Sequence, residues 1–377
     1  MALYNQYRPT NFGDLFGQEY VKRILSHQVK ENKLSNAYLL TGPAGTGKTT
    51  VARIFSSMIN CSSGMTLTPD QNDPNVQMIM SGKSDIDVIE IDAASRRGID
   101  DIKDVRDRSY YAPVSMRKKI WIIDECHQLT GPAWEALLKL LEEPPTQSMF
   151  ILCTTEPHKI SETILTRCMA LRFTAINAQE IYTYLKVIIQ KEQIDIEEEA
   201  VRLLAKSSKG SPRQAVSNLE KVMNLGCKID AALVSQTVGV PSTKLIKDFL
   251  ISVVDAKFED GLKASSQAIA AGVTAADFIE EIATYFHHLM VIKLKCLPSY
   301  NLTQEEINEI EQVRTAFVDR MEKLQQGSAS NAIPIILVMI KAISGIKSYS
   351  IYNMNHQYTL DFVWMILIKA LRKGTST

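Results

Sequence analysis

A glycine-rich stretch, GPAGTGKTT, has the residue types and spacing that hold a nucleotide by its phosphates. Its glycines let the backbone curl so that amides point at phosphate oxygens, the lysine reaches the terminal phosphates, and the next hydroxyl can ligate magnesium. The stretch follows the apolar run AYLL and precedes the helical pattern TTVARIFSSMIN, which is the strand, loop and helix order that this motif requires. We expect the nucleotide contacts to come from Gly42, Pro43, Ala44, Gly45, Thr46, Gly47, Lys48, Thr49 and Thr50.

An acidic pair ends a second apolar run, KKIWIIDECHQL. Ligands of open α/β sheets bind at the carboxyl ends of the strands, so Asp124 is expected near magnesium together with Thr49. Glu125 follows directly and is suited to orient and polarise a water against the γ-phosphate. An acidic pair at a strand end is usually a solvated loop. The phosphate-binding loop upstream makes magnesium-dependent ATP hydrolysis the prediction here.

Three further side chains belong to this hypothesis. Thr155, at the end of the run SMFILCTT, is placed to hydrogen-bond the attacking water or the γ-phosphate. Arg167 precedes the run CMALRF, and Arg213 begins a helical pattern in KGSPRQAV. Taken singly, each arginine is more typical of a surface residue than of a catalytic one. Their order along the chain is what suggests a role.

The composition favours a folded chain of several domains. With 377 residues, two or three domains are expected, and 45% apolar with 22% charged residues is typical of globular proteins. Lys plus Arg and Asp plus Glu both number 42, so any contact with nucleic acid must be local. The sequence shows no signal peptide and no apolar run long enough to span a membrane, which predicts a cytoplasmic protein without membrane contact.

The order of patterns predicts an α/β domain followed by helices. In residues 1–175, five short apolar runs alternate with helix-length segments, as in a parallel sheet with crossover helices. Residues 176–240 have helical spacing and are predicted to form a small helical domain that ends near GVPSTK. Residues 241–377 are helical again and are predicted to form a separate bundle or an oligomerisation surface.

Taken together, these stretches resemble AAA+ ATPases and, within that class, the gamma/tau subunits of bacterial DNA polymerase III clamp loaders. The resemblance covers about the first 240 residues. It includes YRPTNFGDLFGQE, DVIEIDAASRRGIDDIKDVRD, ALLKLLEEPP and ILTRCMALRF. It implies an AAA+ P-loop domain with a parallel sheet, a helical lid and an all-helical collar.

The resemblance also implies roles for single residues. Lys48 and Thr49 match the Walker A contacts, Asp124 and Glu125 match the Walker B magnesium ligand and catalytic acid, and Thr155 matches the first sensor. The same comparison assigns three arginines and a proline. Arg8 and Pro9 are expected to contact the nucleotide, Arg213 matches the second sensor, and Arg167 matches the finger that reaches the ATP of a neighbouring subunit.

The family implies a pentameric ring with other loader subunits. Such a ring opens a sliding clamp when ATP is bound and hydrolyses ATP once primer-template DNA fills its centre. A local DNA contact is offered by Ser95, Arg96, Arg97 and Lys103, at and just after the start of a helix whose amides favour phosphate. A solvated charged loop is the alternative interpretation of that stretch.

One segment departs from the family pattern. Bacterial relatives complete a zinc site after the dipeptide NC, whereas this chain has Asp70, Asp73 and Val76 where thiolates are expected. Cys61 alone is too few for a structural zinc, which takes four ligands. We therefore predict that the protein binds no zinc, and that its cofactors are ATP and magnesium alone. The loss of the zinc site also predicts a divergent or phage-encoded loader.

Two other functions remain open at this level. A scaffold subunit without catalysis is one, and the intact set of nucleotide-site residues speaks against it. The other is a related AAA+ DNA remodeller, such as a helicase loader or a branch-migration motor.

Overall fold

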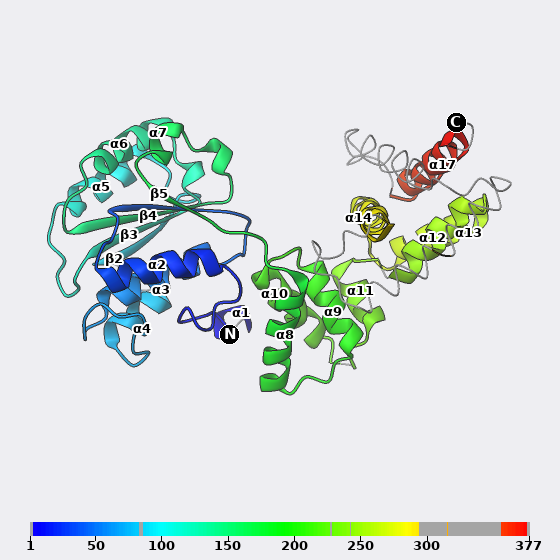
Figure 1. Cartoon of the computed structure of the whole chain (residues 1–377), viewed down its shortest axis with the longest axis horizontal. Helices are drawn as coiled ribbons and strands as arrows, with labels where there is room; N and C mark the ends of the chain where they lie inside the picture. Colours follow the sequence, from blue (N-terminus) through cyan, green and yellow to red (C-terminus); the bar gives the residue numbers. More distant parts are fainter. Residues whose placement is uncertain are drawn as a thin grey trace. The chain divides into compact units, whose positions relative to one another are not determined.

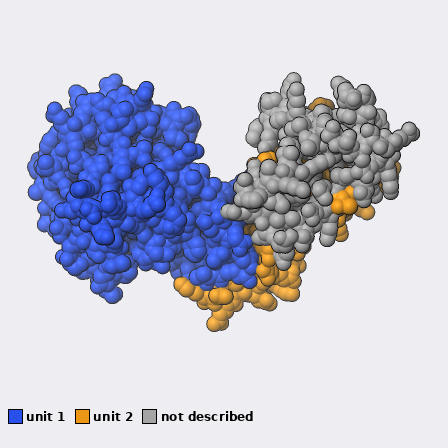
Figure 2. All heavy atoms as spheres, viewed as in Figure 1, with its two compact units in different colours: residues 1–188, 208–217 blue, residues 189–207, 218–377 orange. Residues whose placement is uncertain are grey.

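The computed structural model describes residues 3–82, 86–226, 228–241, 243–293, 315 and 356–374. The chain divides into two compact units, residues 1–188 with 208–217 and residues 189–207 with 218–377 (Figure 2). Within the described ranges, no helix is both long and apolar enough to cross a bilayer. Much of the predicted collar lies outside the described residues, and the domain boundaries near 175 and 240 stay a prediction.

A five-stranded sheet forms the centre of the first unit. Its strands are parallel and lie in the order β2-β3-β4-β1-β5. Leu39 of β1 is in register with Leu152 of β4 and Ala170 of β5. All five predicted apolar runs are strands, so the α/β class is confirmed. The bounds are β1 (Ala37–Thr41), β2 (Val88–Asp92), β3 (Lys119–Asp124), β4 (Ser148–Thr154) and β5 (Met169–Arg172).

Helices cover both faces of this sheet (Figure 1). Because successive strand residues point to opposite faces, Trp121 and Ile122 of β3 belong to different core clusters. Both are fully buried, which explains why the strand is an unbroken apolar run. One face carries α2 (Glu19–Glu31), α3 (Lys48–Asn60) and α4 (Pro74–Ser81), and the other carries α5 (Ile99–Ser109), α6 (Gly131–Glu142) and α7 (Glu162–Leu165).

Parallel strands bring their carboxyl ends to one edge of the sheet, and this edge positions the candidate site. β3 ends at Asp124 and β4 at Thr154, while α3 begins at Lys48 directly after the glycine-rich loop. The remaining elements of this part are α1 (Leu3–Gln6), η1 (Cys126–Gln128), η2 (Pro157–Lys159), α8 (Ala178–Glu192) and α10 (Pro212–Met223). The helices α8 and α10 each contain residues of both units, because the boundaries between the units lie after residues 188 and 217.

The second unit is helical in the part that the structure describes, apart from one bridge between Ile196 and Ile229. Phe249, Phe278 and Leu360 are fully buried in one core shared by α12, α13, α14 and α17. This agrees with the helical patterns after residue 176. The bounds are α9 (Glu198–Ser207), α11 (Ala231–Val238), α12 (Thr243–Val254), α13 (Phe258–Ala270), α14 (Ala275–Lys293) and α17 (His356–Gly374).

Candidate nucleotide-binding site

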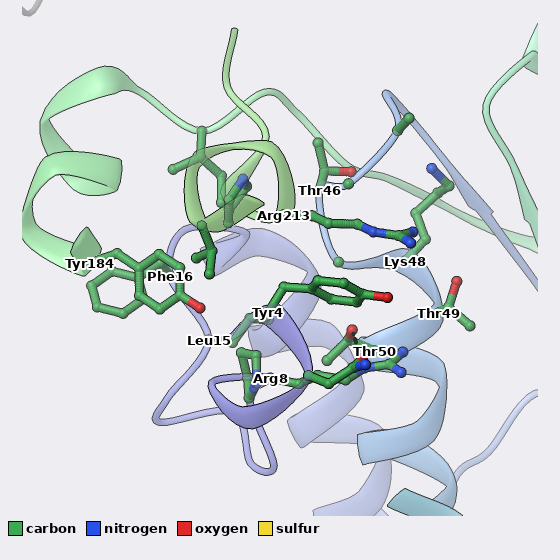
Figure 3. A pocket seen from close by; sticks show the side chains of 18 of the residues that line it. Tyr4, Arg8, Leu15, Phe16, Thr46, Lys48, Thr49, Thr50, Tyr184 and Arg213 are labelled. Carbon is green, nitrogen blue, oxygen red and sulfur yellow. Dashed lines mark hydrogen bonds between the residues drawn. The ribbon is translucent and has the colours of Figure 1, made fainter. Parts of the chain in front are cut away.

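A cavity of about 340 Å³ lies in the first unit, beside the glycine-rich loop (Figure 3). Its polar lining comes from the loop and the start of α3, from the end of β3, from the start of α10 and from Asn5 and Arg8 near the N-terminus. Its apolar lining comes from segments near both ends of the unit's sequence. The lining residues are Tyr4, Asn5, Arg8, Pro9, Leu15, Phe16, Ala44, Gly45, Thr46, Gly47, Lys48, Thr49, Thr50, Asp124, Glu125, Ile176, Tyr184, Pro212, Arg213 and Val216.

All three glycines of the loop have a positive φ, which other residues rarely adopt, and at two of them a side chain would also have no space. Gly42 has φ +146° and Gly45 has φ +72°. A Cβ atom on Gly42 would collide with the carbonyl oxygen of Phe173, and one on Gly45 with the hydroxyl of Ser211. The curl of the loop therefore depends on glycine at both positions.

Lys48 is the first residue of α3, and its side chain is held inside the loop. The Nζ atom donates to the carbonyl oxygens of Gly42 at 2.8 Å and Pro43 at 2.9 Å. The residue is only 6% exposed, and burial lowers the pKa of its ammonium group. Both of these acceptors are neutral carbonyl oxygens, so the poorly solvated ammonium charge would interact favourably with a bound anion.

Thr49 and Asp124 meet across the loop. The Thr49 hydroxyl donates to Oδ2 of Asp124 at 2.6 Å, and the amide of Glu125 donates to Oδ1 at 3.0 Å. Burial raises the pKa of the Asp124 carboxyl, in spite of these hydrogen bonds. A hydroxyl and a carboxylate in contact are the hard oxygen ligands that magnesium takes alongside nucleotide phosphates. The residues present therefore fit this ion.

Glu125 and Thr155 also lie together. The Thr155 hydroxyl donates to Oε2 of Glu125 at 2.8 Å, and the Thr155 amide is 3.3 Å from the same oxygen. Glu125 has φ +46°, an uncommon left-handed conformation for a residue other than glycine. The backbone therefore turns sharply after β3, next to the end of β4.

Two arginines supply positive charge at the cavity. Nε of Arg8 donates to the Thr50 hydroxyl at 2.9 Å. Burial, followed by the charge of Arg53, lowers the pKa of Arg8 to about 10. The guanidinium of Arg213 lies over the ring of Tyr4, 4.9 Å from its centre (Figure 3). Pro9 lines the same cavity, so Arg8, Pro9 and Arg213 all lie beside the glycine-rich loop, and their contacts with nucleotide stay a prediction.

Arg167 lies apart from these residues. It does not line the cavity, and its side chain is 32% exposed. Its Nη2 atom is 2.7 Å from Oε1 of Glu142, and its Nη1 atom donates to the carbonyl oxygen of Thr163 at 2.8 Å. The geometry shows a surface arginine held by the LEEPP stretch. Its predicted role at a neighbouring subunit stays a prediction.

The residues predicted to contact DNA are all exposed. Ser95, Arg96 and Arg97 lie in the loop between β2 and α5, and Lys103 lies one turn into that helix, 3.1 Å from Asp100. The first turn of α5 also carries two acids, and Asp101 already accepts from the amide of Gly98 at 3.1 Å. The predicted start of a helix is present, and a DNA contact there stays a prediction.

The segment that departs from the family pattern is organised by Asp73. Its carboxylate accepts from the amides of Ser62 and Asn75, both at 2.8 Å, and lies 3.4 Å from Sγ of Cys61. These hydrogen bonds outweigh burial and lower the pKa of Asp73. Among the described residues, no group of three or more His, Cys, Asp and Glu side chains is placed to hold a metal. The prediction of no zinc stays a prediction.

Sequence reasoning missed the apolar wall of the cavity. The rings of Phe16 and Tyr184 lie 5.0 Å apart, and the Tyr184 hydroxyl donates to the carbonyl oxygen of Tyr7 at 3.0 Å. Tyr4 covers the wall beside Arg213 (Figure 3). No role was assigned to these residues, although Phe16 lies in the YRPTNFGDLFGQE stretch, and Tyr184 is far from the other two along the chain. The one available signal was the position of Tyr4 and Phe16 on either side of the YRP stretch.

A parallel sheet of this order, with a glycine-rich loop after β1 and an acidic pair after β3, defines the AAA+ class of P-loop proteins. The sequence model of the family "DNA polymerase III, delta subunit" matches residues 17–177 of this chain. The sequence model of the family "DNA polymerase III clamp loader subunit, ATPase lid domain" matches residues 180–226. The chain is 34% identical to the DNA polymerase III subunit gamma of Buchnera aphidicola, covering 77% of this chain and 80% of that protein. The chain belongs to the gamma/tau family of DNA polymerase III clamp-loader subunits.

Other relatives are longer. The chain is 38% identical to the DNA polymerase III subunit tau of Bacillus subtilis, over 78% of this chain and 52% of that protein. It matches the tau subunit of Escherichia coli at 35% identity over 78% of this chain and 46% of that protein. The chain thus spans about half the length of these curated relatives.

Proposed function

We propose that this chain is an ATPase subunit of a sliding-clamp loader, which couples ATP binding and hydrolysis to opening the clamp and placing it on primer-template DNA. The observation that carries the proposal is the contact of Thr49 with Asp124 beside Lys48, in a member of the gamma/tau family. The loop amides and Lys48 would hold the phosphates, and Thr49 and Asp124 would hold magnesium. When bound, magnesium neutralises charge that develops on the phosphate oxygens.

The remaining residues act on the reacting groups in this proposal. Glu125 orients the attacking water, and Thr155 holds the Glu125 carboxylate at the cavity. Arg213 contacts the γ-phosphate of the ATP that is bound to the same subunit. Arg167 reaches the ATP of the next subunit, where it stabilises charge in the transition state when the ring is assembled.

We also propose the partners and setting that the family implies. The chain would assemble with other loader subunits in a cytoplasmic pentamer, without zinc, and bind DNA phosphates through Ser95, Arg96, Arg97 and Lys103. These side chains are exposed, as a sequence-independent phosphate contact requires. The absence of zinc is supported by Asp73, which stands where a zinc ligand of relatives is expected. Its carboxylate instead accepts hydrogen bonds from the amides of Ser62 and Asn75.

The test is ATP hydrolysis by the full chain assembled with loader subunits, measured with and without clamp and primed DNA. We expect joint stimulation by clamp and primed DNA, and its loss in the Glu125→Gln variant. Stimulation by forked or branched DNA alone would instead favour an AAA+ remodeller. Nucleotide binding without any hydrolysis that depends on Glu125 would favour a scaffold and refute the proposal.

A further inference from the structure

His127 is a buried histidine next to the proposed catalytic residues. It lies in η1, two residues after Glu125, and only 6% of its side chain is exposed. Its Nδ1 atom is 3.1 Å from the hydroxyl oxygen of Thr154 and 3.4 Å from Oε2 of Glu125. Its Nε2 atom is 3.0 Å from Oε1 of Glu156. The imidazole therefore contacts the residues on both sides of Thr155.

Glu156 is held on its other side by a lysine. Nζ of Lys159 lies 3.0 Å from Oε2 of Glu156, and this hydrogen bond lowers the pKa of the carboxyl. An ionised carboxylate only accepts hydrogen bonds, so Nε2 is the nitrogen of His127 that carries hydrogen in this contact. The Glu156 amide in turn donates to the Thr154 hydroxyl at 3.0 Å. The turn after β4 therefore contacts the imidazole ring of His127 through both Thr154 and Glu156.

This turn presents Thr155 to Glu125. The Thr155 hydroxyl and amide both contact Oε2 of Glu125, the same oxygen that faces His127. Glu125 follows β3 and Thr155 follows β4, so the ring joins the ends of two neighbouring strands. A displacement of about 1 Å at a reacting group costs on the order of 10²-fold in rate.

We propose that His127 is a positioning residue that sets the geometry of Glu125 and Thr155 for hydrolysis. The inference rests on the proposed ATPase function. The proposed role of His127 differs from a purely structural one because it affects the rate of the hydrolysis step and leaves folding and nucleotide binding unchanged. Loss of His127 is expected to lower kcat while nucleotide affinity stays close to that of the wild type.

The first experiment compares His127→Ala with a matched control, His158→Ala. His158 lies 3.6 Å from Oε2 of the same Glu156, but its side chain is 72% exposed. The assembled loader is assayed for steady-state hydrolysis with clamp and primed DNA, and the full chain for the affinity of a fluorescent ATP analogue. For His127→Ala we expect kcat to fall about 10- to 100-fold, and affinity to change less than about 3-fold. His158→Ala changes neither quantity.

A conservative variant and a double-mutant cycle separate positioning from folding. His127→Gln keeps a donor near Glu156 and is expected to recover part of kcat. In a Thr155→Ala background, which lacks the hydroxyl that contacts Glu125, His127→Ala causes a smaller further loss, since the histidine acts by positioning that contact. Equal losses in both backgrounds, an unchanged kcat, or a parallel fall in affinity and unfolding temperature would each overturn the inference. A wild type without any Glu125-dependent hydrolysis overturns the proposed function instead, and the inference falls with it.

Discussion

Replacing Arg8 by methionine should stabilise the ligand-free protein and weaken its response to nucleotide. Methionine keeps a long flexible side chain and removes the charge. A pKa lowered from 12.5 to about 10 means that the charged guanidinium costs the folded state about 3 kcal/mol. The cost is fully present below about pH 10, because both folded and unfolded forms are then protonated. Solvent screening and the lost hydrogen bond to Thr50 reduce the net gain to about 1 to 2 kcal/mol.

The assay is thermal unfolding of the full chain with and without magnesium and a slowly hydrolysed ATP analogue. In a unit of this size, 1 to 2 kcal/mol raises the midpoint by about 2 to 8 °C. Nucleotide at 100 times its Kd stabilises the wild type by about 2.7 kcal/mol. A tenfold loss of affinity from the missing guanidinium reduces this to about 1.4 kcal/mol. Nucleotide therefore stabilises the variant less than the wild type.

The matched control is Arg23→Met, because Arg23 is exposed and lies outside the cavity. It should change neither the ligand-free midpoint nor the nucleotide effect. If Arg8→Met lowers the ligand-free midpoint, the hydrogen bond to Thr50 outweighs the cost of the buried charge. If its nucleotide effect equals that of the wild type, Arg8 does not contact the ligand. Either result refutes the reasoning.

Three further predictions concern binding, assembly and acid stability. Lys48→Ala should weaken ATP binding about 10- to 100-fold through loss of charged hydrogen bonds to phosphate, as measured by fluorescent nucleotide titration. Arg167→Ala should leave that affinity intact and slow hydrolysis by the assembled loader about 10³-fold or more, so a normal rate would exclude the role in a neighbouring subunit. Asp87→Asn should destabilise the α/β unit by about 2 to 4 kcal/mol, because the 1% exposed Asp87 accepts from the amides of residues 114–116 at 2.7 to 3.0 Å. Burial alone would raise the pKa of Asp87, but these hydrogen bonds outweigh burial and lower it. The stabilisation from the ionised carboxylate is therefore fully present above about pH 4, the pKa of Asp in the unfolded chain. It is lost as the pH falls from there through the lower pKa of Asp87 in the folded protein. Urea titrations at pH 7 and pH 3 should show a smaller difference between the two proteins at the acidic pH.

Local sequence was sufficient for the parts of the site that lie within one motif or one strand. The glycines, Lys48 and Thr49 are contiguous, and each of the five apolar runs contains the residues that make it a buried strand. Asp124 and Glu125 were predicted because they end such a run. In each case the signal and the structure lie in the same dozen residues.

The contacts between distant segments could be read only from the tertiary structure. Thr49 and Asp124 are 75 residues apart, and the hydroxyl of Tyr184 reaches the carbonyl of Tyr7 across 177 residues. The ring of His127 between Glu125 and Glu156 depends on β3 and β4 being neighbours, which no local pattern specifies. Periodicity shows which face of an element is buried, whereas the partner that covers it is chosen by packing of the whole chain. The sequence therefore determined the nucleotide loop and the strands, and the fold decided which side chains surround them.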